Sequence, residues 1–188
     1  MSSRKDPSDL HVVLVEPDIP WNTGNVGRTC LAVGAQLHLV RPLGFRLDER
    51  YLKRAGLDYW QHVQPDVWPS WSAFEDKLSE IGTPWLFSAE GKIDLWNLEL
   101  SRNGGQDDDT DFSGADSAGS HVLIFGRESA GLSRAVREAY RSRLVRLSMA
   151  DGPVRSLNLS TTVGIVLYEF RRRLGFPAAP QAGSFERI

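Results

Sequence analysis

Five short apolar segments recur along the chain of 188 residues, and their spacing restricts the possible folds more than any other feature. Each segment is followed by glycine, proline or polar residues, and most are then followed by a stretch with helical character. This alternation is typical of an α/β domain with a parallel sheet, because parallel neighbours need a long crossover connection. We therefore predict a mostly parallel sheet flanked by helices, with strands at 11–15, 36–40, 84–87, 121–125 and 144–147.

The most regular helical pattern lies near the C-terminus. Apolar residues at intervals of three and four predict one buried helix face there, formed by Val163, Val166, Leu167, Phe170 and Leu174. Ser156 or Asn158 is a candidate N-cap, and Gly175 ends the pattern. Two further helices are expected after Asn22 and after Ser133.

The stretch 101–120 differs from the rest of the chain, because it is rich in glycine, serine and aspartate and has a single aromatic residue. It can bury too little apolar surface to offset the entropy lost on ordering, so we predict a disordered acidic insertion. The remainder is expected to form one domain over 10–177, with flexible tails at 1–9 and 178–188.

Several classes of protein are disfavoured by composition. Cys30 is the one cysteine, so an internal disulfide is excluded and an oxidising compartment is not indicated. The four histidines are scattered without ligand spacing, so we expect no metal site. Neither a signal peptide nor an apolar run long enough to cross a membrane is present, so a cytoplasmic location with no membrane association is expected.

Charge is distributed unevenly along the chain. The formal net charge is −2, yet the segment 127–173 holds ten arginines against four acidic residues. A basic patch of this kind is compatible with phosphate binding. Arginines on solvated helix faces would give the same pattern, and charge alone leaves both interpretations open.

Three glycine-bearing loops follow predicted strands, at 16–28, 125–132 and 147–160. Ligands bind to α/β sheets at the carboxyl ends of the strands, where such loops lie. The chain has no GxxxxGK[ST] and no GxGxxG pattern, which argues against a Walker-type site and a dinucleotide site. A ligand read mainly by backbone groups, such as adenine and a methionine moiety, suits these loops better than a triphosphate; each loop alone could also be an ordinary strand-to-helix turn.

In this order, the loops resemble the motifs of the SPOUT superfamily of RNA methyltransferases. The first loop is similar to an Asn-x-Gly-Asn-x-x-Arg element, with Asn22, Gly24, Asn25 and Arg28. The second is similar to a Phe-Gly-x-Glu-x-x-Gly-Leu element, with Phe125, Gly126, Glu128, Gly131 and Leu132. The third is similar to Ser-[Leu/Met]-Asn-Leu-Ser ahead of a helix with Tyr-Glu, here 156–160 with Tyr168 and Glu169. The stretches 42–45 and 53–59 resemble the branch of tRNA (cytidine/uridine-34-2′-O)-methyltransferases, and the likeness runs from about residue 10 to 176.

The resemblance implies more than the residues alone do. It implies an α/β domain with a C-terminal deep trefoil knot, a homodimer, and S-adenosylmethionine as the cofactor. The implied reaction is 2′-O-methylation of a tRNA nucleotide, at the wobble position in the narrower branch. Two alternatives stay open: the same chemistry on another RNA such as ribosomal RNA, and a catalytically silent knotted protein that binds RNA.

Site residues are carried over position by position from the family motifs. Arg28 corresponds to the catalytic arginine, and we expect it to fix the reacting hydroxyl and the adjacent phosphate rather than to act as a base, because guanidinium stays protonated. The implied cofactor-binding residues are Ala89, Gly126, Gly131, Leu147, Ser156 and Asn158. The implied RNA-binding residues are Asn22, Arg127, Arg155 and Tyr168, with the cluster 171–173 as a further candidate for phosphate contacts.

Glu128 is expected to orient the second loop or to contact the RNA, or else to be an ordinary charge at a helix start. The third loop also departs from the family pattern. Leu147, Ser148 and Met149 stand where the family usually has Ile-Pro-Met, and the loop after them is one residue longer. Both differences fall where the cofactor is expected to bind.

Overall fold

The structure is a computed structural model that describes residues 8–46, 59–100 and 119–177. Its seven strands form one sheet in which every pair is parallel, in the order β3-β2-β1-β6-β4-β7-β5. The strands are β1 Leu10–Val15, β2 Gln36–Val40, β3 Asp66–Trp68, β4 Thr83–Phe87, β5 Ile93–Asp94, β6 His121–Phe125 and β7 Leu144–Arg146. The predicted parallel α/β fold is confirmed, and all five expected strands occur within one residue of their predicted bounds.

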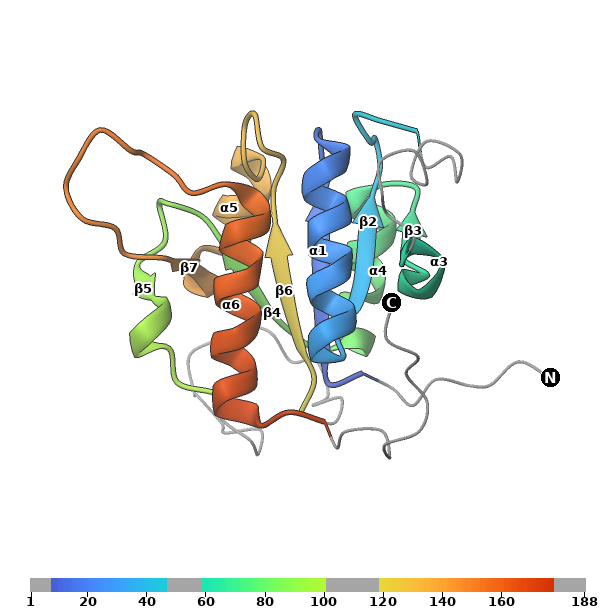
Figure 1. Ribbon diagram of the computed structural model, residues 1–188. Coiled ribbons are helices and arrows are strands. Elements are labelled where there is room, and N and C mark those ends of the chain that lie inside the picture. The colour runs from blue at the N-terminus through green and yellow to red at the C-terminus, as the bar shows by residue number, and fades with distance from the viewer. Residues whose placement is uncertain (1–7, 47–58, 101–118, 178–188) are drawn as a thin grey trace.

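Helices cover both faces of the sheet (Figure 1). One face carries α1 Pro20–Val33 and α6 Leu159–Leu174, which lie side by side. The other face carries α4 Trp71–Ile81 and α5 Arg134–Ala139. Shorter elements are α3 Trp60–Val63 and the 3-10 turns η1 Leu95–Asn97 and η2 Arg141–Arg143.

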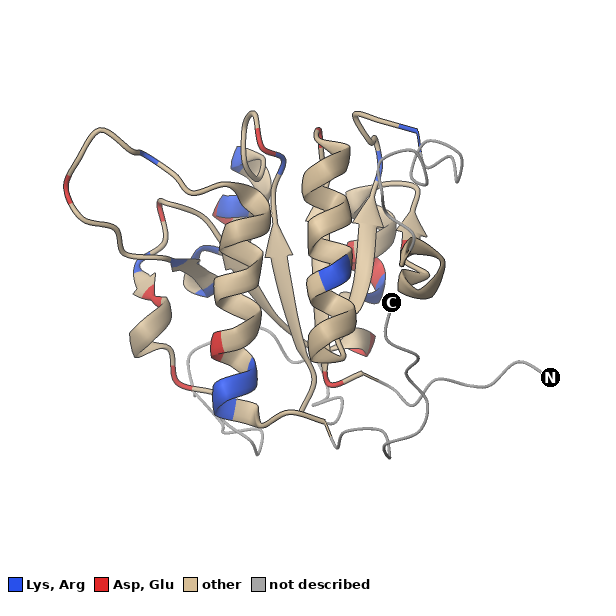
Figure 2. Ribbon diagram, in the orientation of Figure 1, with Lys and Arg blue, Asp and Glu red and all other residues tan. Residues whose placement is uncertain are grey.

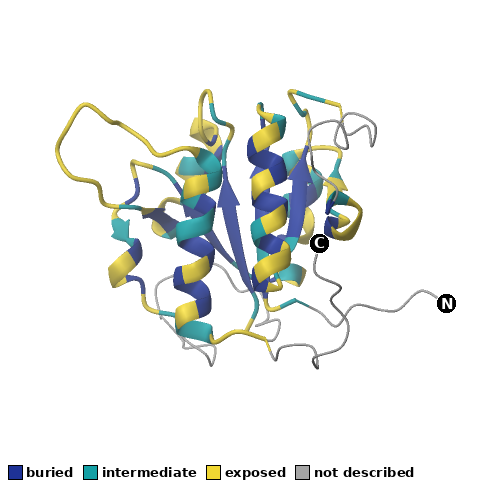
Figure 3. Ribbon diagram, in the orientation of Figure 1, coloured by how far each residue is buried: buried dark blue, intermediate teal, exposed yellow. Residues whose placement is uncertain are grey.

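The core follows from the alternation of side chains along the strands. In β6, Leu123 and Phe125 pack with α1 and α6, whereas Val122 and Ile124 pack with α4 and α5. Because successive strand residues point to opposite faces, a strand covered on both sides has to be apolar throughout. Figure 3 shows the central strands buried along their length, as this argument requires.

The ends of the two long helices are set by local residues. Asn158 caps α6 by accepting hydrogen bonds from the amides of Ser160 at 2.9 Å and Thr161 at 3.3 Å, so Asn158 and not Ser156 is the cap. Helix α1 begins at Pro20, before the expected start at Asn22, because proline fits the first helical position. It ends at Gly34, whose φ of 68° lies in the left-handed region.

Two histidines and the cysteine lie in the interior, with His38 and Cys30 buried and His11 partly buried. His11 and His38 join Trp68 in a hydrogen-bonded chain, with distances of 3.1 Å from Trp68 Nε1 to His38 Nδ1 and 3.0 Å from His38 Nε2 to His11 Nδ1. The indole only donates, so both imidazoles are neutral in this chain. Burial raises the pKa of the Cys30 thiol to about 12, so Cys30 is an inert core residue.

Some expectations lie outside the described residues. These are the tails at 1–7 and 178–188, the insertion at 101–118, and residues 53–58 of the family-like stretch 53–59. Within the described part of the chain, no helix combines the length and apolarity needed to cross a membrane.

Candidate cofactor and RNA site

A cavity of about 610 Å³ lies at the carboxyl ends of β4, β6 and β7. The strand register aligns Phe87 with Phe125 and with Val145, so the loops after these strands emerge next to one another. The rings of Phe87 and Phe125 stack with centroids 4.7 Å apart and line the cavity. The cavity therefore has the size and the apolar lining of a small-molecule site.

All six residues implied to bind the cofactor line this cavity. They come from three loops that are far apart in sequence: Ala89 after β4, Gly126 and Gly131 after β6, and Leu147, Ser156 and Asn158 after β7. Asn22, Arg127 and Arg155, which were implied to contact RNA, line it as well. The structure thus gathers nine of the eleven implied site residues in one place.

The loop after β6 explains why glycine stands at two of these positions. A bridge joins Arg127 to Gly131, and the amide of Gly131 donates to the carbonyl of Arg127 at 2.8 Å. A Cβ on Gly126 would lie 2.1 Å from backbone atoms of Gly131 and Leu132, because the loop closes on itself there. Gly131 has φ of +67° with open space on its Cβ side. Gly126 is therefore required by the closure of the loop itself.

A chain of polar contacts connects the three motif loops. Asn158 Nδ2 donates to Asn22 Oδ1 at 2.9 Å, and Asn22 Nδ2 donates to Glu128 Oε1 at 2.8 Å. The other oxygen of Glu128 accepts from the amide of Asp18 at 2.8 Å, and Asp18 accepts from the amide of Ser129 at 3.2 Å. Asn22 is buried, so a missing partner in this chain would leave a polar group unsatisfied.

Glu128 is the site residue that sequence reasoning undervalued. It was considered as an orienting group or a plain helix-start charge, and the structure places its carboxylate between the first and second loops. The signal for it was present, because Glu128 is one of the motif residues of the second loop. Its partners lie more than 100 positions away in sequence, so no local pattern could identify them.

Arg28 lies elsewhere. It is exposed on α1, its guanidinium carbon is 4.3 Å from the centre of the Tyr59 ring, and it does not line the cavity. Arg28 is six positions after Asn22, which corresponds to about 9 Å along the helix and to a different helix face. Tyr168 is also outside the cavity: it is exposed on α6, with its ring 6.0 Å from that of Phe176.

The charges at the cavity are partly paired. Arg127 forms an ion pair with Glu16 at 2.8 Å, and Arg137 forms one with Glu90 at 3.1 Å. Arg155, on the loop between β7 and α6, is exposed and has no ion pair within the described residues. That loop is exposed along most of its length (Figure 3).

A contact outside the cavity holds the start of this loop. The hydroxyl of Ser148 donates a hydrogen bond to the carboxylate of Asp94, and this bond lowers the pKa of Asp94. Asp94 also accepts from the amide of Trp96 at 3.0 Å, so it is the cap of η1. Leu147 and Met149, on either side of Ser148, both line the cavity. A polar side-chain contact therefore holds the loop where the family pattern has proline.

The comparison with known proteins agrees with this arrangement. A model of the "SpoU rRNA Methylase family" matches residues 9–168. A tRNA (cytidine(34)-2′-O)-methyltransferase from Burkholderia pseudomallei is 41% identical over 168 residues, covering 89% of this chain and 97% of the relative.

Two solved structures are also similar. A crystal structure of a Bacillus anthracis protein has a TM-score of 0.77 and 39% identity, and the match covers 92% of this chain and 99% of that one. A structure described as giving insights into the 2-OH methylation of C/U34 on tRNA has a TM-score of 0.71 and 41% identity, with 90% and 99% covered. With the three motif loops meeting at one cavity and the family model spanning most of the chain, the protein belongs to the SpoU rRNA methylase family.

Proposed function

We propose that this protein transfers the methyl group of S-adenosylmethionine to the ribose 2′-hydroxyl of nucleotide 34 of tRNA. The observation that carries the proposal is the convergence of all six implied cofactor residues on one cavity at the carboxyl ends of β4, β6 and β7. The names of the relatives support the choice of tRNA and of its position 34, since two of the similar proteins are described by that reaction.

The lining of the cavity fits such a cofactor. Phe87, Phe125 and Leu147 offer apolar surface for an adenine ring, and strand-end backbone groups offer donors and acceptors for its edge. The carboxylate of Glu90, which also lines the cavity, offers a negative charge for the amino group of a methionine tail. When bound, S-adenosylmethionine supplies an electrophilic methyl group on sulfur.

The chain's own residues then have to align and activate the hydroxyl. A ribose hydroxyl is a poor nucleophile at neutral pH, and much of the rate comes from holding it in line with the methyl group. The chain of contacts from Asn158 through Asn22 to Glu128 holds the three loops in register. Arg28 is proposed to fix the hydroxyl and neighbouring phosphate and to stabilise the developing alkoxide, with the proton leaving to phosphate or water.

A homodimer would complete this site. Arg28 lies outside the cavity of its own chain, on an exposed face of α1. The neighbouring surface of α1, α6 and the loop before α6 exposes large apolar side chains, namely Trp21, Leu31, Leu157 and Tyr168. Such a patch marks an association surface, and we propose that a second copy packs there and brings its Arg28 to the site. Light scattering of the purified protein measures this directly, and a monomer at micromolar concentration would contradict it.

We also propose a trefoil knot, a single domain over 10–177 and a cytoplasmic location. The knot is supported by membership in the family, because general rules of chain topology make knots very rare. The all-parallel sheet, in which β6 lies between β1 and β4, is compatible with it.

The experiment that tests the function is methylation of tRNA transcripts by the purified enzyme, with the modified nucleotide mapped. Methylation at position 34 that is lost when the ribose carries 2′-deoxy at that position is the expected result. The family description names ribosomal RNA, so a ribosomal RNA substrate is the second candidate and belongs in the same assay. Binding of RNA and of S-adenosylhomocysteine without any methylation would favour a silent RNA-binding protein instead.

A further inference from the structure

The ten arginines between 127 and 173 do not form one basic surface, because the fold uses several of them internally. Arg171 is 1% exposed, and it donates to the carbonyls of Val33 and Gly34 at 2.7 and 3.1 Å. It also pairs with the carboxylate of Asp9 at 2.8 Å. Arg171 therefore fastens the end of α6 to the end of α1, and it is not available to a ligand.

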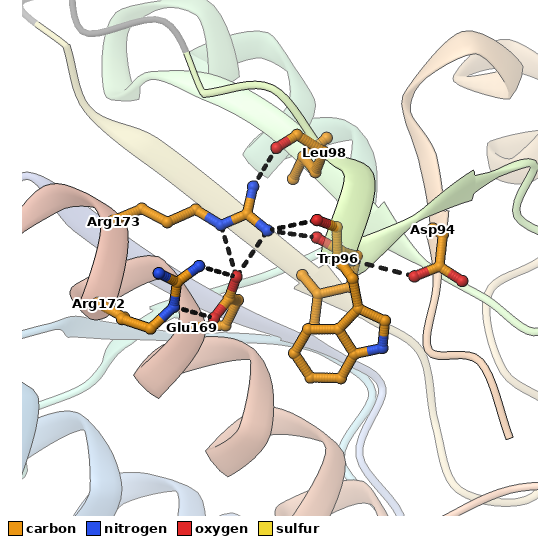
Figure 4. A network of polar contacts seen from close by, with 7 residues as sticks. Asp94, Trp96, Leu98, Glu169, Arg172 and Arg173 are labelled. Carbon is orange, nitrogen blue, oxygen red and sulfur yellow. Dashed lines mark hydrogen bonds and ion pairs between the residues drawn. The ribbon is translucent and has the colours of Figure 1, made fainter.

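The two arginines that follow are anchored to Glu169 (Figure 4). Arg173 donates to the carboxylate of Glu169 at 2.6 Å, and its other nitrogens donate to the carbonyls of Leu95, Trp96 and Leu98. The hydrogen bond from Arg172 and the paired charges lower the pKa of Glu169 to about 2. The expectation that 171–173 contact phosphates is therefore wrong for Arg171 and Arg173, whose donors are directed at the protein.

Three of the other arginines gather in a different place, together with Lys92. A second cavity of about 430 Å³ is lined by four basic residues from three elements: Lys92 before β5, Arg134 and Arg137 on α5, and Arg141 on η2. Two carboxylates also line it, with Glu138 2.7 Å from Arg134 and Glu90 3.1 Å from Arg137. Figure 2 shows the basic positions on α5, behind the sheet.

Among the described residues, Lys92 and Arg141 are the cations of this cavity that form no ion pair. Both are exposed, and neither has an ion pair with any described residue. Four cations against two carboxylates give the lining a positive balance, although the whole chain is net −2. A site of this composition favours a ligand with more than one negative charge.

The second cavity adjoins the first. Glu90 and Arg137 line both, so the ion pair between them forms part of the wall that the two cavities share. A polyanion with one unit in the cofactor cavity would continue over this wall toward Lys92 and Arg141. A single small anion could bind in one cavity alone, whereas a nucleic-acid backbone would extend through both adjoining cavities.

We propose that Lys92 and Arg141, flanked by Arg134 and Arg137, bind backbone phosphates of the RNA substrate next to the reaction site. The proposal rests on the proposed function, because it takes the RNA whose nucleotide is methylated in the first cavity to be the occupant of the second. Neither Lys92 nor Arg141 belongs to the motifs that the family likeness supplies. Their contribution is to affinity and orientation, without contact to the reacting atoms.

The test compares two variants that change the net charge by the same two units. Lys92→Ala with Arg141→Ala empties the proposed surface. Lys77→Glu is the matched control, since Lys77 on α4 is exposed and lines neither cavity. The probe is a tRNA transcript with cytidine at position 34, and its Kd is measured by filter binding from 50 to 200 mM salt. Each lost phosphate contact lowers the slope of log K against log salt by about one.

The expected result is a rise of roughly tenfold or more in the tRNA Kd for Lys92→Ala/Arg141→Ala, with a slope smaller by about one to two. Its Kd for S-adenosylhomocysteine and its single-turnover rate at saturating tRNA should equal those of the wild type. Equal loss in the control variant would overturn the proposal, because net charge and not this surface would be responsible. An unchanged tRNA Kd and slope in the test variant, with normal methylation by the wild type, would overturn the proposal and leave the proposed function standing. Failure of the wild type to bind or methylate tRNA would overturn both.

Discussion

Asn158 serves two purposes that a pair of substitutions can separate. Its side-chain oxygen caps α6, and its side-chain nitrogen donates to Asn22 in the chain that joins the motif loops. Asn158→Ala removes both. Loss of an N-cap costs about 1 kcal/mol, and leaving the buried Asn22 oxygen without its donor adds about 1–2 kcal/mol. The free energy of unfolding should therefore fall by about 2–3 kcal/mol, which lowers Tm by roughly 5–10 °C in a chain of this length.

Asn158→Asp keeps an oxygen to cap the helix, and its charge interacts favourably with the helix N-terminus. It cannot donate to Asn22, and it places a carboxylate oxygen against the Asn22 oxygen. We expect Asn158→Asp to be about 1 kcal/mol more stable than Asn158→Ala, but to bind S-adenosylhomocysteine as weakly as that variant. Loss of one hydrogen bond that aligns the loops corresponds to roughly tenfold in Kd.

Urea unfolding and calorimetric titration with S-adenosylhomocysteine provide the two measurements. If Asn158→Asp were no more stable than Asn158→Ala, the capping role would be wrong. If Asn158→Asp bound the ligand as well as the wild type, the chain from Asn158 to Glu128 would have no part in shaping the cavity, and the reasoning from geometry to binding would fail.

Three other predictions follow from the structure. Gly126→Ala should abolish binding of S-adenosylhomocysteine in calorimetry, because its Cβ would lie 2.1 Å from backbone atoms. The Cβ of Gly131→Ala meets no atom within 4 Å, so this variant should cost only the strain of its φ, about 1–2 kcal/mol. Equal ligand affinities of the two variants would contradict this account of the loop. Arg28→Ala should lower the single-turnover methylation rate by ~10²–10³ with little change in cofactor affinity. Arg155→Ala should instead raise the tRNA concentration needed for the half-maximal rate. Normal turnover by Arg28→Ala at saturating tRNA would show that Arg28 has no catalytic role. Burial lowers the pKa of His38 to about 3 and also lowers the pKa of His11. Both imidazoles are therefore neutral in the folded state and take up protons on unfolding. Their contribution to the free energy of unfolding is present above about pH 6.5 and is lost as the pH falls from there toward 3. Urea unfolding between pH 6.5 and 4 should therefore show a flatter pH dependence for His38→Asn than for the wild type, and parallel curves would mean that this imidazole is not the group that titrates.

The apolar segments located the longer strands well, because a strand covered by helices on both faces has to be apolar throughout. Edge strands lack this signal. β3 has exposed residues at two of its three positions, and β5 is two residues long, so both are defined by pairing with a neighbour rather than by their own sequence. The predicted start of α1 was too late for a related reason, because Pro20 and Trp21 precede the apolar residues from which the helix was predicted.

The cofactor residues could be named from the motif likeness, and parallel strands explain why they meet: the carboxyl ends of β4, β6 and β7 lie at one edge of the sheet. The likeness could not say that Arg28 and Tyr168 stand outside this cavity in a single chain. Helical phase decides that, and it depends on which face of each helix packs on the sheet.

The arginines show which features of this protein depend on neighbouring residues and which depend on residues far away in the sequence. The periodicity of α6 is determined by a few neighbouring residues, so the sequence alone revealed it and narrowed the cap of this helix to Ser156 or Asn158. Whether an arginine is buried, paired or free depends on groups far away in the chain: Arg171 meets Val33 across 138 positions, and Arg173 meets Leu95 across 78. Those partners come together only when the sheet is assembled. Because the energy of a charge depends on its surroundings in space, the role of each arginine is decided at that stage. Tertiary structure therefore decided which cations hold the fold and which ones face the solvent beside the cavity.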